Sequence, residues 1–484
     1  MEKRKYTLGS KLGYAAGDVL GGGAFALVSL LFLNFLVTVE GIPAALGGVI
    51  VMIGKFWDAL IDPTLGIISD RTKSRFGRRR VFLLAGIIPV ILTFALLWYS
   101  FGIQGTTLKF IYYLFMYLLF TTSFSIIQVP YNALLSDMVE DYEARAGYSS
   151  MRILISNIAA TISVTVPSMI LGPVETRTPY SFLLMSIIFG LFFGLPILIT
   201  FFTTKEPEKQ VNEEVITIRM MLKQLGKALK NKTFLQFIGI FIFAQAATDV
   251  SSAATTFWLT DIVGKGNMVT IVSGITMIVG LLVLPINNRI AQKMGKHCPG
   301  YITLPLRILA MFIALFLGKS TGMIVIILTC VIMGAGAGAA SFVPYTILPD
   351  LPDTDEMITG NHNAGIYAGM ATFLRTASSG IAVFLAGVGL DVFGYIESTA
   401  GEVVQQSATA LLGVRVIFSV IPILLTVVAV ILSIRFRMTK EAHKDMMQAI
   451  AIKHETGKPT QDEKLIASCE KISGMAFETM WVGQ

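Results

Sequence analysis

Charge is the property that this sequence lacks most. Only 14% of its 484 residues are Asp, Glu, Lys or Arg and 54% are hydrophobic, whereas a soluble domain carries about 25% charged residues. The deficit excludes an ordinary soluble domain and indicates an integral membrane protein that contacts the lipid bilayer. The net charge of +7 does not predict nucleic-acid binding, because the cations gather in loops on one side of the predicted membrane.

Cysteine and histidine are also scarce, with 3 and 4 copies. Cys298, Cys330 and Cys469 are too widely spaced to indicate a disulfide framework or a metal site. No two histidines have metal-ligand spacing, and no Gly-x-Ser-x-Gly elbow is present. We therefore expect no resident cofactor and no enzymatic activity. A membrane-embedded hydrolase is the weak alternative, and a receptor or scaffold would leave the intramembrane acids described below unexplained.

Long apolar runs, by contrast, recur through the chain. A membrane-spanning helix needs about 20 mostly apolar residues, and the sequence predicts twelve such helices in an all-α membrane protein. The expected spans are residues 14–38, 42–68, 81–103, 108–136, 148–172, 180–203, 233–262, 267–288, 300–317, 321–348, 364–391 and 409–434.

The spans divide evenly around one polar stretch. We expect an N-terminal six-helix half over residues 1–204, a cytoplasmic linker over 205–232, a C-terminal six-helix half over 233–435 and a cytoplasmic tail over 436–484. Within the linker, residues 216–229 are amphipathic and are expected at the membrane surface. The tail has room for a short helix, and nothing in it indicates an independent domain. Two sets of six spans are typical of transporters built from two related halves.

The basic residues predict the orientation. Most Lys and Arg outside the spans fall on the side of the two termini. The opposite side holds only Lys109, Arg177, Lys265 and Lys319. By the positive-inside rule both termini are cytoplasmic, and we expect a monomer in the plasma membrane.

One apolar segment contains three ionisable side chains. Lys55, Asp58 and Asp62 are spaced i, i+3 and i+7, so they share one face of a helix. A carboxylate near the bilayer centre costs about 2.5–3.5 kcal/mol, which marks it as a functional candidate. Two carboxylates about 6 Å apart repel by about 2.8 kcal/mol at an effective dielectric constant near 20. The pair therefore favours a bound proton or metal cation, which is the chemistry of an ion-coupled carrier.

Further charges fall at membrane depth: Asp18, Arg152, Asp249, Arg307, Arg375 and Arg415. Arg152 and Arg415 lie near helix ends, where a long side chain can reach the interface. Arg375 lies in the middle of a span and needs an acid. We expect it to pair with Asp58 or Asp62; the alternative is a structural ion pair unrelated to transport.

Several motifs resemble those of one family, the glycoside–pentoside–hexuronide:cation symporters, a melibiose-permease-like branch of the major facilitator superfamily. The segment KFWDALIDP, residues 55–63, is similar to the signature of their second helix, and the basic loop at 70–78 is similar to the loop that follows it. The other matching segments are residues 11–18, 128–134, 141–152, 348–356 and 365–395.

The resemblance implies the major facilitator fold and transport driven by a gradient of H⁺ or Na⁺. It implies a cation site at Asp58, Asp62 and Ser125, whose carboxylates would be the metal ligands if the ion is Na⁺. Lys55 and Arg375 take coupling roles beside it. The family has an asparagine at the position of Ile61, and its absence, together with the charge of Arg375, favours a proton.

The resemblance also implies a substrate site. Its residues are Asp18, Gly22, Gln128, Asn132, Arg152 and Tyr367. In the melibiose permease two aspartates hold the sugar hydroxyls, and here Gly22 and Gln128 replace them. Loss of two carboxylates favours a uronide, another acidic glycoside or a bulkier conjugate over a small neutral galactoside. We expect Gly22 to leave room for a larger substituent.

Charged cytoplasmic loops are candidates for a gate. We expect ion pairs between the basic and acidic loops to close the inner face; the alternative is that these charges are merely solvated. The residues are Asp70, Arg71, Arg78, Asp350, Asp353, Asp355 and Glu356.

The sequence thus predicts a secondary active transporter for cation-coupled symport of a sugar, glycoside or hexuronide by alternating access. A carrier of an amphiphile such as a lysolipid, on the same fold, is the alternative. A sugar site should offer polar side chains and an aromatic platform, whereas a lipid carrier should open an apolar side path between helices.

Overall fold

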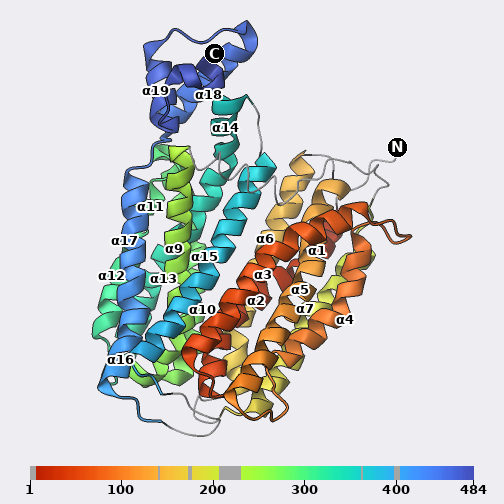
Figure 1. Ribbon diagram of the computed structural model, residues 1–484, viewed down its shortest axis with the longest axis vertical. Helices are drawn as coiled ribbons and strands as arrows, with labels where there is room; N and C mark the ends of the chain where they lie inside the picture. Colours follow the sequence, from red (N-terminus) through yellow and green to blue (C-terminus); the bar gives the residue numbers. More distant parts are fainter. Residues whose placement is uncertain are drawn as a thin grey trace.

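The computed structural model describes residues 7–139, 142–172, 177–206, 231–360, 364–396 and 404–483, and within these ranges it contains helices and no strand. Figure 1 shows two bundles of long helices side by side, the first half of the chain in red to yellow and the second half in green to blue. A smaller helical group from the C-terminal tail lies at one end, which we call the tail end.

The first bundle is built from apolar helices whose lengths follow the expected spans. They are α1 (Leu8–Ala15) and α2 (Asp18–Thr38), which together make one span, then α3 (Ala44–Arg71), α4 (Arg80–Leu96), α5 (Thr106–Met138), α6 (Tyr142–Leu171) and α7 (Pro179–Thr203). Aromatic rings fill its interior. Trp98 stacks on Phe182 with ring centroids 5.8 Å apart, and both side chains are fully buried.

The second bundle repeats this plan with more interruptions. Its elements are α9 (Lys232–Phe257) with the π-helical turn η2 (Trp258–Ile262), η3 (Gly266–Met268), α10 (Val269–Met294), α11 (Pro299–Ile302), α12 (Pro305–Phe316), α13 (Met323–Ile347), α15 (Ala364–Val392), and a last span of α16 (Ala408–Arg415), η5 (Val416–Val420) and α17 (Ile421–Ile434).

Eleven helical segments of the described chain are long and apolar enough to cross a membrane, and α4 is a twelfth, shorter apolar helix of 17 residues. Each corresponds to one expected span. The difference at α4 has a local cause: the chain takes positive φ at Phe101, Gly102 and Gly105, a conformation that cannot continue a helix. The helix ends at Leu96, and these residues keep the span from extending to residue 103 as expected.

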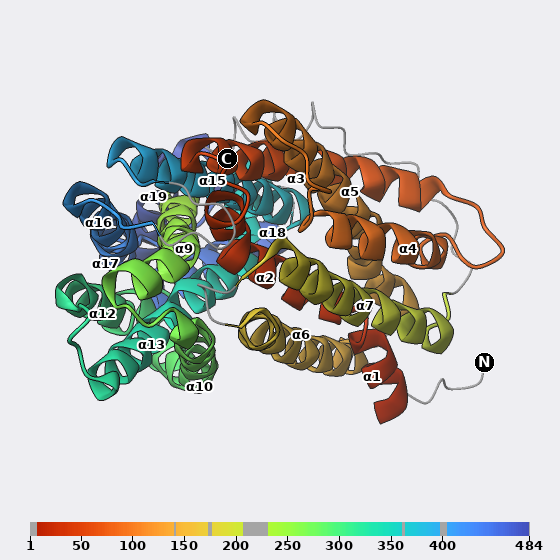
Figure 2. The same ribbon diagram turned by 90° about the horizontal axis from the view of Figure 1, so that it is seen from below.

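The two bundles meet closely at the end opposite the tail, where α3 begins and α15 ends (Figure 2). A Cβ on Gly387 would lie 2.2 Å from the carbonyl oxygen of Ala44, and one on Gly48 would lie 2.8 Å from Cα of Phe384. Only glycine permits such backbone approach. The Asp391 carboxylate also accepts a 2.9 Å hydrogen bond from the Ala45 N–H. We call this contact of α3 with α15 the α3–α15 seam.

The tail is more ordered than expected. It forms α18 (Lys440–Thr456), α19 (Glu463–Ser473), η6 (Phe477–Thr479) and η7 (Trp481–Gly483), and the segment expected as an acidic loop forms η4 (Leu348–Asp350) and α14 (Leu351–Thr359). Met446, Cys469 and Met480 are fully buried in a core that includes Phe234 of α9 and Met357 of α14. The tail thus forms more helix than the short one expected, because its apolar residues pack against the second bundle. The amphipathic stretch at 216–229 lies outside the described residues.

Candidate functional site

The acid pair lies on α3, the helix that also forms the seam. Asp58 is buried, and its Oδ1 accepts a 3.1 Å hydrogen bond from the Ser125 hydroxyl of α5. Asp62 follows one turn later, and its buried Oδ1 has no hydrogen-bond partner within the described ranges. The structure thus brings together the three residues expected to hold a cation. An unsatisfied carboxylate oxygen beside a second carboxylate and a hydroxyl is a suitable environment for a proton or a small hard cation.

Lys55 lies one turn before Asp58 on the same helix. Its Nζ lies 3.6 Å from the centroid of the Phe25 ring on α2, so the ammonium gains a cation–π contact. Asp58, Asp62, Asp249 and Arg375 are all within electrostatic range of it. The charges on α3 and those of the second bundle therefore form one connected group.

Arg375 does not pair with the acids of α3, and that expectation is corrected. Its guanidinium on α15 binds Asp249 on α9, with Nη1 3.1 Å from Oδ2 and Nη2 3.3 Å from Oδ1. The Nη2 contact is a charge-assisted hydrogen bond, and the Nη1 contact is an ion pair without hydrogen-bond geometry. Because Arg375 is held by Asp249, the basic residue that accompanies the acid pair is Lys55, on the same helix.

A second polar cluster lies between α2, α5 and α6. Buried Asp18 accepts a 2.9 Å hydrogen bond from the Gln128 amide and forms a 3.1 Å ion pair with Arg152. The Arg152 guanidinium also lies 5.1 Å from the centroid of the Tyr131 ring. The amide of Gln128 reaches Asn132 Oδ1 at 3.5 Å. Four of the six expected substrate residues are therefore together, and Arg152 is neutralised by Asp18 within this cluster.

The other two expected substrate residues lie in different surroundings. A Cβ on Gly22 would lie 2.3 Å from the carbonyl oxygen of Ser156 on α6, so Gly22 serves close helix packing and leaves no room for a larger substrate. Tyr367 donates a 3.3 Å hydrogen bond to Asp355 and packs edge-on against Phe234. It thereby joins α15 to α14 at the tail end.

A cavity of about 410 Å³ lies between the two bundles. Leu30 of α2 and Asn157 of α6 line it from the first bundle, and α9, α10, α12 and α13 line it from the second. Its one lining ionic residue is Arg307 of α12, which is only 2% exposed. Sequence reasoning marked Arg307 as an intramembrane charge but gave it no role. The sequence did indicate that Arg307 is unusual, because the rest of α12 is apolar.

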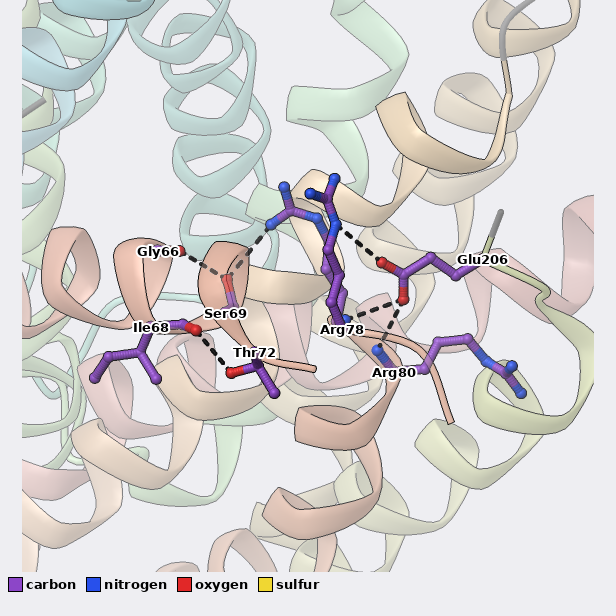
Figure 3. Close-up of polar contacts among 8 residues, drawn as sticks. Gly66, Ile68, Ser69, Thr72, Arg78, Arg80 and Glu206 are labelled. Carbon is purple, nitrogen blue, oxygen red and sulfur yellow. Dashed lines mark hydrogen bonds and ion pairs between the residues drawn. The ribbon is translucent and has the colours of Figure 1, made fainter. Parts of the chain in front are cut away.

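The expected gate residues have partners on their own side of the molecule. Arg78 Nε lies 3.3 Å from Glu206 Oε1, and Glu206 Oε2 accepts backbone N–H bonds from Arg79 and Arg80 (Figure 3). These contacts tie the α3–α4 loop to the end of α7, within the first bundle. The side chains of Asp70 and Arg71 lie outside the described residues.

The acidic segment at α14 binds the second bundle and the tail. Asp350 pairs with Lys296 at 2.6 Å, Asp353 with His443 at 2.9 Å, and Glu356 with His454 at 2.7 Å. Asp355 accepts the Tyr367 bond already described. Two of these contacts, those of Asp353 and Glu356, hold the tail on α14, and the expected gate between the two bundles stays a prediction.

Comparison with known proteins gives the class. A family model described as MFS/sugar transport protein matches residues 13–440, so the chain belongs to the MFS/sugar transport protein family. It is similar to the uncharacterized symporter YnaJ of Bacillus subtilis, at 27% identity over 92% of this chain and 95% of that one. It is similar to the glucuronide carrier protein homolog of Escherichia coli, at 21% identity over 91% and 94%.

A solved structure shares the fold. The nucleoside transporter NupG, in a mutant form, superposes with a TM-score of 0.66 over 88% of this chain and all of that one, at 13% identity. The major facilitator fold expected from the sequence is confirmed. So is the expectation of a multi-pass membrane transporter rather than an enzyme, since the family and these neighbours are transporters.

Proposed function

We propose that this protein is a secondary active symporter that couples a cation, H⁺ or Na⁺, to uptake of a sugar, glycoside or hexuronide across the plasma membrane. The observation that carries the proposal is the pair of acids Asp58 and Asp62 on the apolar helix α3, with the Ser125 hydroxyl of α5 bound to Asp58. The names of the symporter and glucuronide-carrier relatives support it.

The position of α3 explains how cation and substrate are coupled. The same helix carries the acid pair and forms the α3–α15 seam, and a Cβ on Gly380 of α15 would lie 2.9 Å from Cβ of Lys55. Neutralising the acid pair changes the electrostatic energy of α3 against the second bundle, so it shifts the balance between open and closed seams. Substrate that favours the same state then shares a coupling free energy, typically about 1–3 kcal/mol, with the cation.

The orientation follows from charge. The tail end carries most of the loop Lys and Arg, and the positive-inside rule places it in the cytoplasm. On this assignment the α3–α15 seam lies on the outer side of a carrier that works by alternating access. The cavity volume lies within the range of about 300–1,000 Å³ typical of small-molecule sites.

A second candidate cargo is an amphiphile such as a lysolipid. Leu281 and Leu284 of α10 line the cavity, and Leu282 beside them is 68% exposed on the outer face of the bundle. An apolar tail could therefore leave the cavity along α10. The hydroxyl and amide side chains in the cavity wall, such as Asn157 and Ser252, favour a glycoside.

The test is uptake by purified protein in proteoliposomes. Labelled glucosides, glucuronides and lysophosphatidylcholine are offered with an imposed pH gradient, an imposed Na⁺ gradient or neither. Accumulation of a glycoside above its external concentration, abolished when the gradient is collapsed, is the expected result. If the glycoside only equilibrates across the membrane, with or without either gradient, the result would contradict symport. Accumulation of the lysolipid alone would favour the second candidate.

A further inference from the structure

Arg307 differs from Arg152 and Arg375 in its partners. Arg152 is held by Asp18 and Arg375 by Asp249. Arg307 donates instead to neutral oxygens: Thr248 Oγ1 at 2.8 Å, Ser251 Oγ at 2.6 Å and the Ala247 carbonyl at 3.0 Å. All three lie on α9 and fix the guanidinium at the cavity wall. Asp249 acts on it through space but is bound to Arg375.

The guanidinium has donors to spare. Arginine carries five N–H groups and stays charged in proteins, and three are used by the bonds to α9. Nε is buried and has no partner within the described ranges. A permanently charged, 2% exposed group with free N–H donors beside a cavity is poised for an anion.

The cavity walls offer neutral groups for hydroxyls. Asn157 of α6, Ser252 of α9, Ser273 of α10 and Ser341 of α13 line it. Their side chains make no hydrogen bond to other described residues, in contrast to Thr248 and Ser251. Because they come from both bundles, a polyhydroxylated ligand would join the halves. Apolar side chains such as Met277 and Met333 complete the wall.

The net charge of the ionisable groups that interact electrostatically with Arg307 depends on whether the acid pair holds a cation. The group consists of the cations Lys55, Arg307 and Arg375 and the acids Asp58, Asp62 and Asp249. Lys55 acts through space on the three acids and on Arg375, and Asp249 acts on Arg307. Fully ionised, they sum to zero. A proton or Na⁺ on the acid pair leaves one positive charge in a low-dielectric region, and a monoanionic ligand would remove it. The same count disfavours a dianion such as a phosphate ester.

We propose that Arg307 is the anion-recognition residue of this carrier, and that the cavity takes a monoanionic, carboxylate-bearing glycoside with an apolar aglycone. The proposal rests on the proposed function and gives its substrate class. Cation loading and anion binding then favour each other, because each neutralises the charge that the other creates.

The test uses two ligands that differ only at C6: 4-nitrophenyl β-D-glucuronide and 4-nitrophenyl β-D-glucoside. Equilibrium binding to purified protein should favour the glucuronide at least tenfold. Arg307→Gln should bring the ratio within twofold, because it should weaken glucuronide binding much more than glucoside binding. Arg415→Gln is the matched control, since Arg415 binds the Leu315 carbonyl away from the cavity, and it should keep the full preference.

Contrary results are equally specific. A wild-type protein that does not prefer the glucuronide, or an Arg307→Gln variant that keeps the tenfold ratio, overturns the proposal. If Arg307→Gln does not fold, Arg307→Lys keeps the charge without the fork and should reduce the ratio without abolishing it. Glucose 6-phosphate should compete less well than glucuronate; stronger competition would contradict the charge count.

One further variant separates this proposal from the proposed function. Asp58→Asn should make glucuronide binding independent of pH and Na⁺ while the glucuronide preference remains. Transport that is not cation-driven, with the preference lost in Arg307→Gln, would refute symport and leave the role of Arg307 standing.

Discussion

Arg375 on α15 and Asp249 on α9 form a two-point ion pair, with contacts of 3.1 Å and 3.3 Å. The pair joins two helices of the second bundle and leaves the acids of α3 without a guanidinium. It therefore separates a structural pair from the group of Lys55, Asp58 and Asp62 on α3, which we expect to respond to a cation.

Neutralising one member of that pair should destabilise the protein. Arg375→Gln or Asp249→Asn leaves a partly buried charge without its partner, at a cost of about 1–3 kcal/mol. The double variant removes both charges and should be more stable than the sum of the single losses predicts. Thermal unfolding in detergent measures the three variants. Additive losses would show that the contact has little energetic weight.

Removing either acid of α3 should uncouple transport without unfolding the protein. Asp58→Asn and Asp62→Asn each eliminate the like-charge pair that binds the cation. Gradient-driven accumulation should then fall to the equilibrium level, whereas exchange of labelled for unlabelled substrate continues. Asp261→Asn is the control, because Asp261 is an acid of the second bundle held by Tyr395 at 2.8 Å. Wild-type accumulation in both α3 variants would refute the cation role.

The coupling ion should be a proton. Ile61 supplies no oxygen between the two acids, and Lys55 places a positive charge one turn from Asp58. Both features disfavour a metal ion, which needs six or more oxygen ligands or bound water. At fixed pH, the rate of uptake should therefore not depend on the external Na⁺ concentration. Adding substrate should cause protons to move inward with it. A saturable Na⁺ requirement with no proton movement would contradict this.

The sequence predicted the features that depend on local geometry. Spans followed from apolar length, and the common face of Lys55, Asp58 and Asp62 followed from the helical repeat. The partner of Arg375 could not be predicted, because several acids lie at membrane depth and only helix packing selects Asp249. The role of the tail was missed for a similar reason: α18 has a polar composition, and its buried side is recognisable only against α14.

The tail should protect its own cysteine. Cys469 is fully buried, and burial together with the nearby charges of Asp445 and Glu470 raises the pKa of its thiol to about 12. The thiol is therefore protonated and unreactive at pH 8. Maleimide labelling followed by mass spectrometry should leave Cys469 unmodified. Met480→Ala removes a buried neighbour from the same core and should increase the labelling rate at least tenfold; labelling of the intact protein at the rate of a free thiol would show that the tail is not packed.

The α3–α15 seam should control which side of the cavity is open. Gly387→Val places a branched side chain where even a Cβ would lie 2.2 Å from the Ala44 carbonyl oxygen, so this end can no longer close. Transport should fall at least tenfold, while binding of 4-nitrophenyl β-D-glucuronide to purified protein remains.

A reporter cysteine, Ser252→Cys, lies in the cavity wall. In oriented vesicles, a membrane-impermeant maleimide should label it faster from the seam side in the Gly387→Val background. Gly66→Ala is the control, because a Cβ there meets nothing closer than 3.8 Å and α3 remains otherwise the same. Unchanged labelling with wild-type transport in Gly387→Val would show that the cycle does not require closure of this seam.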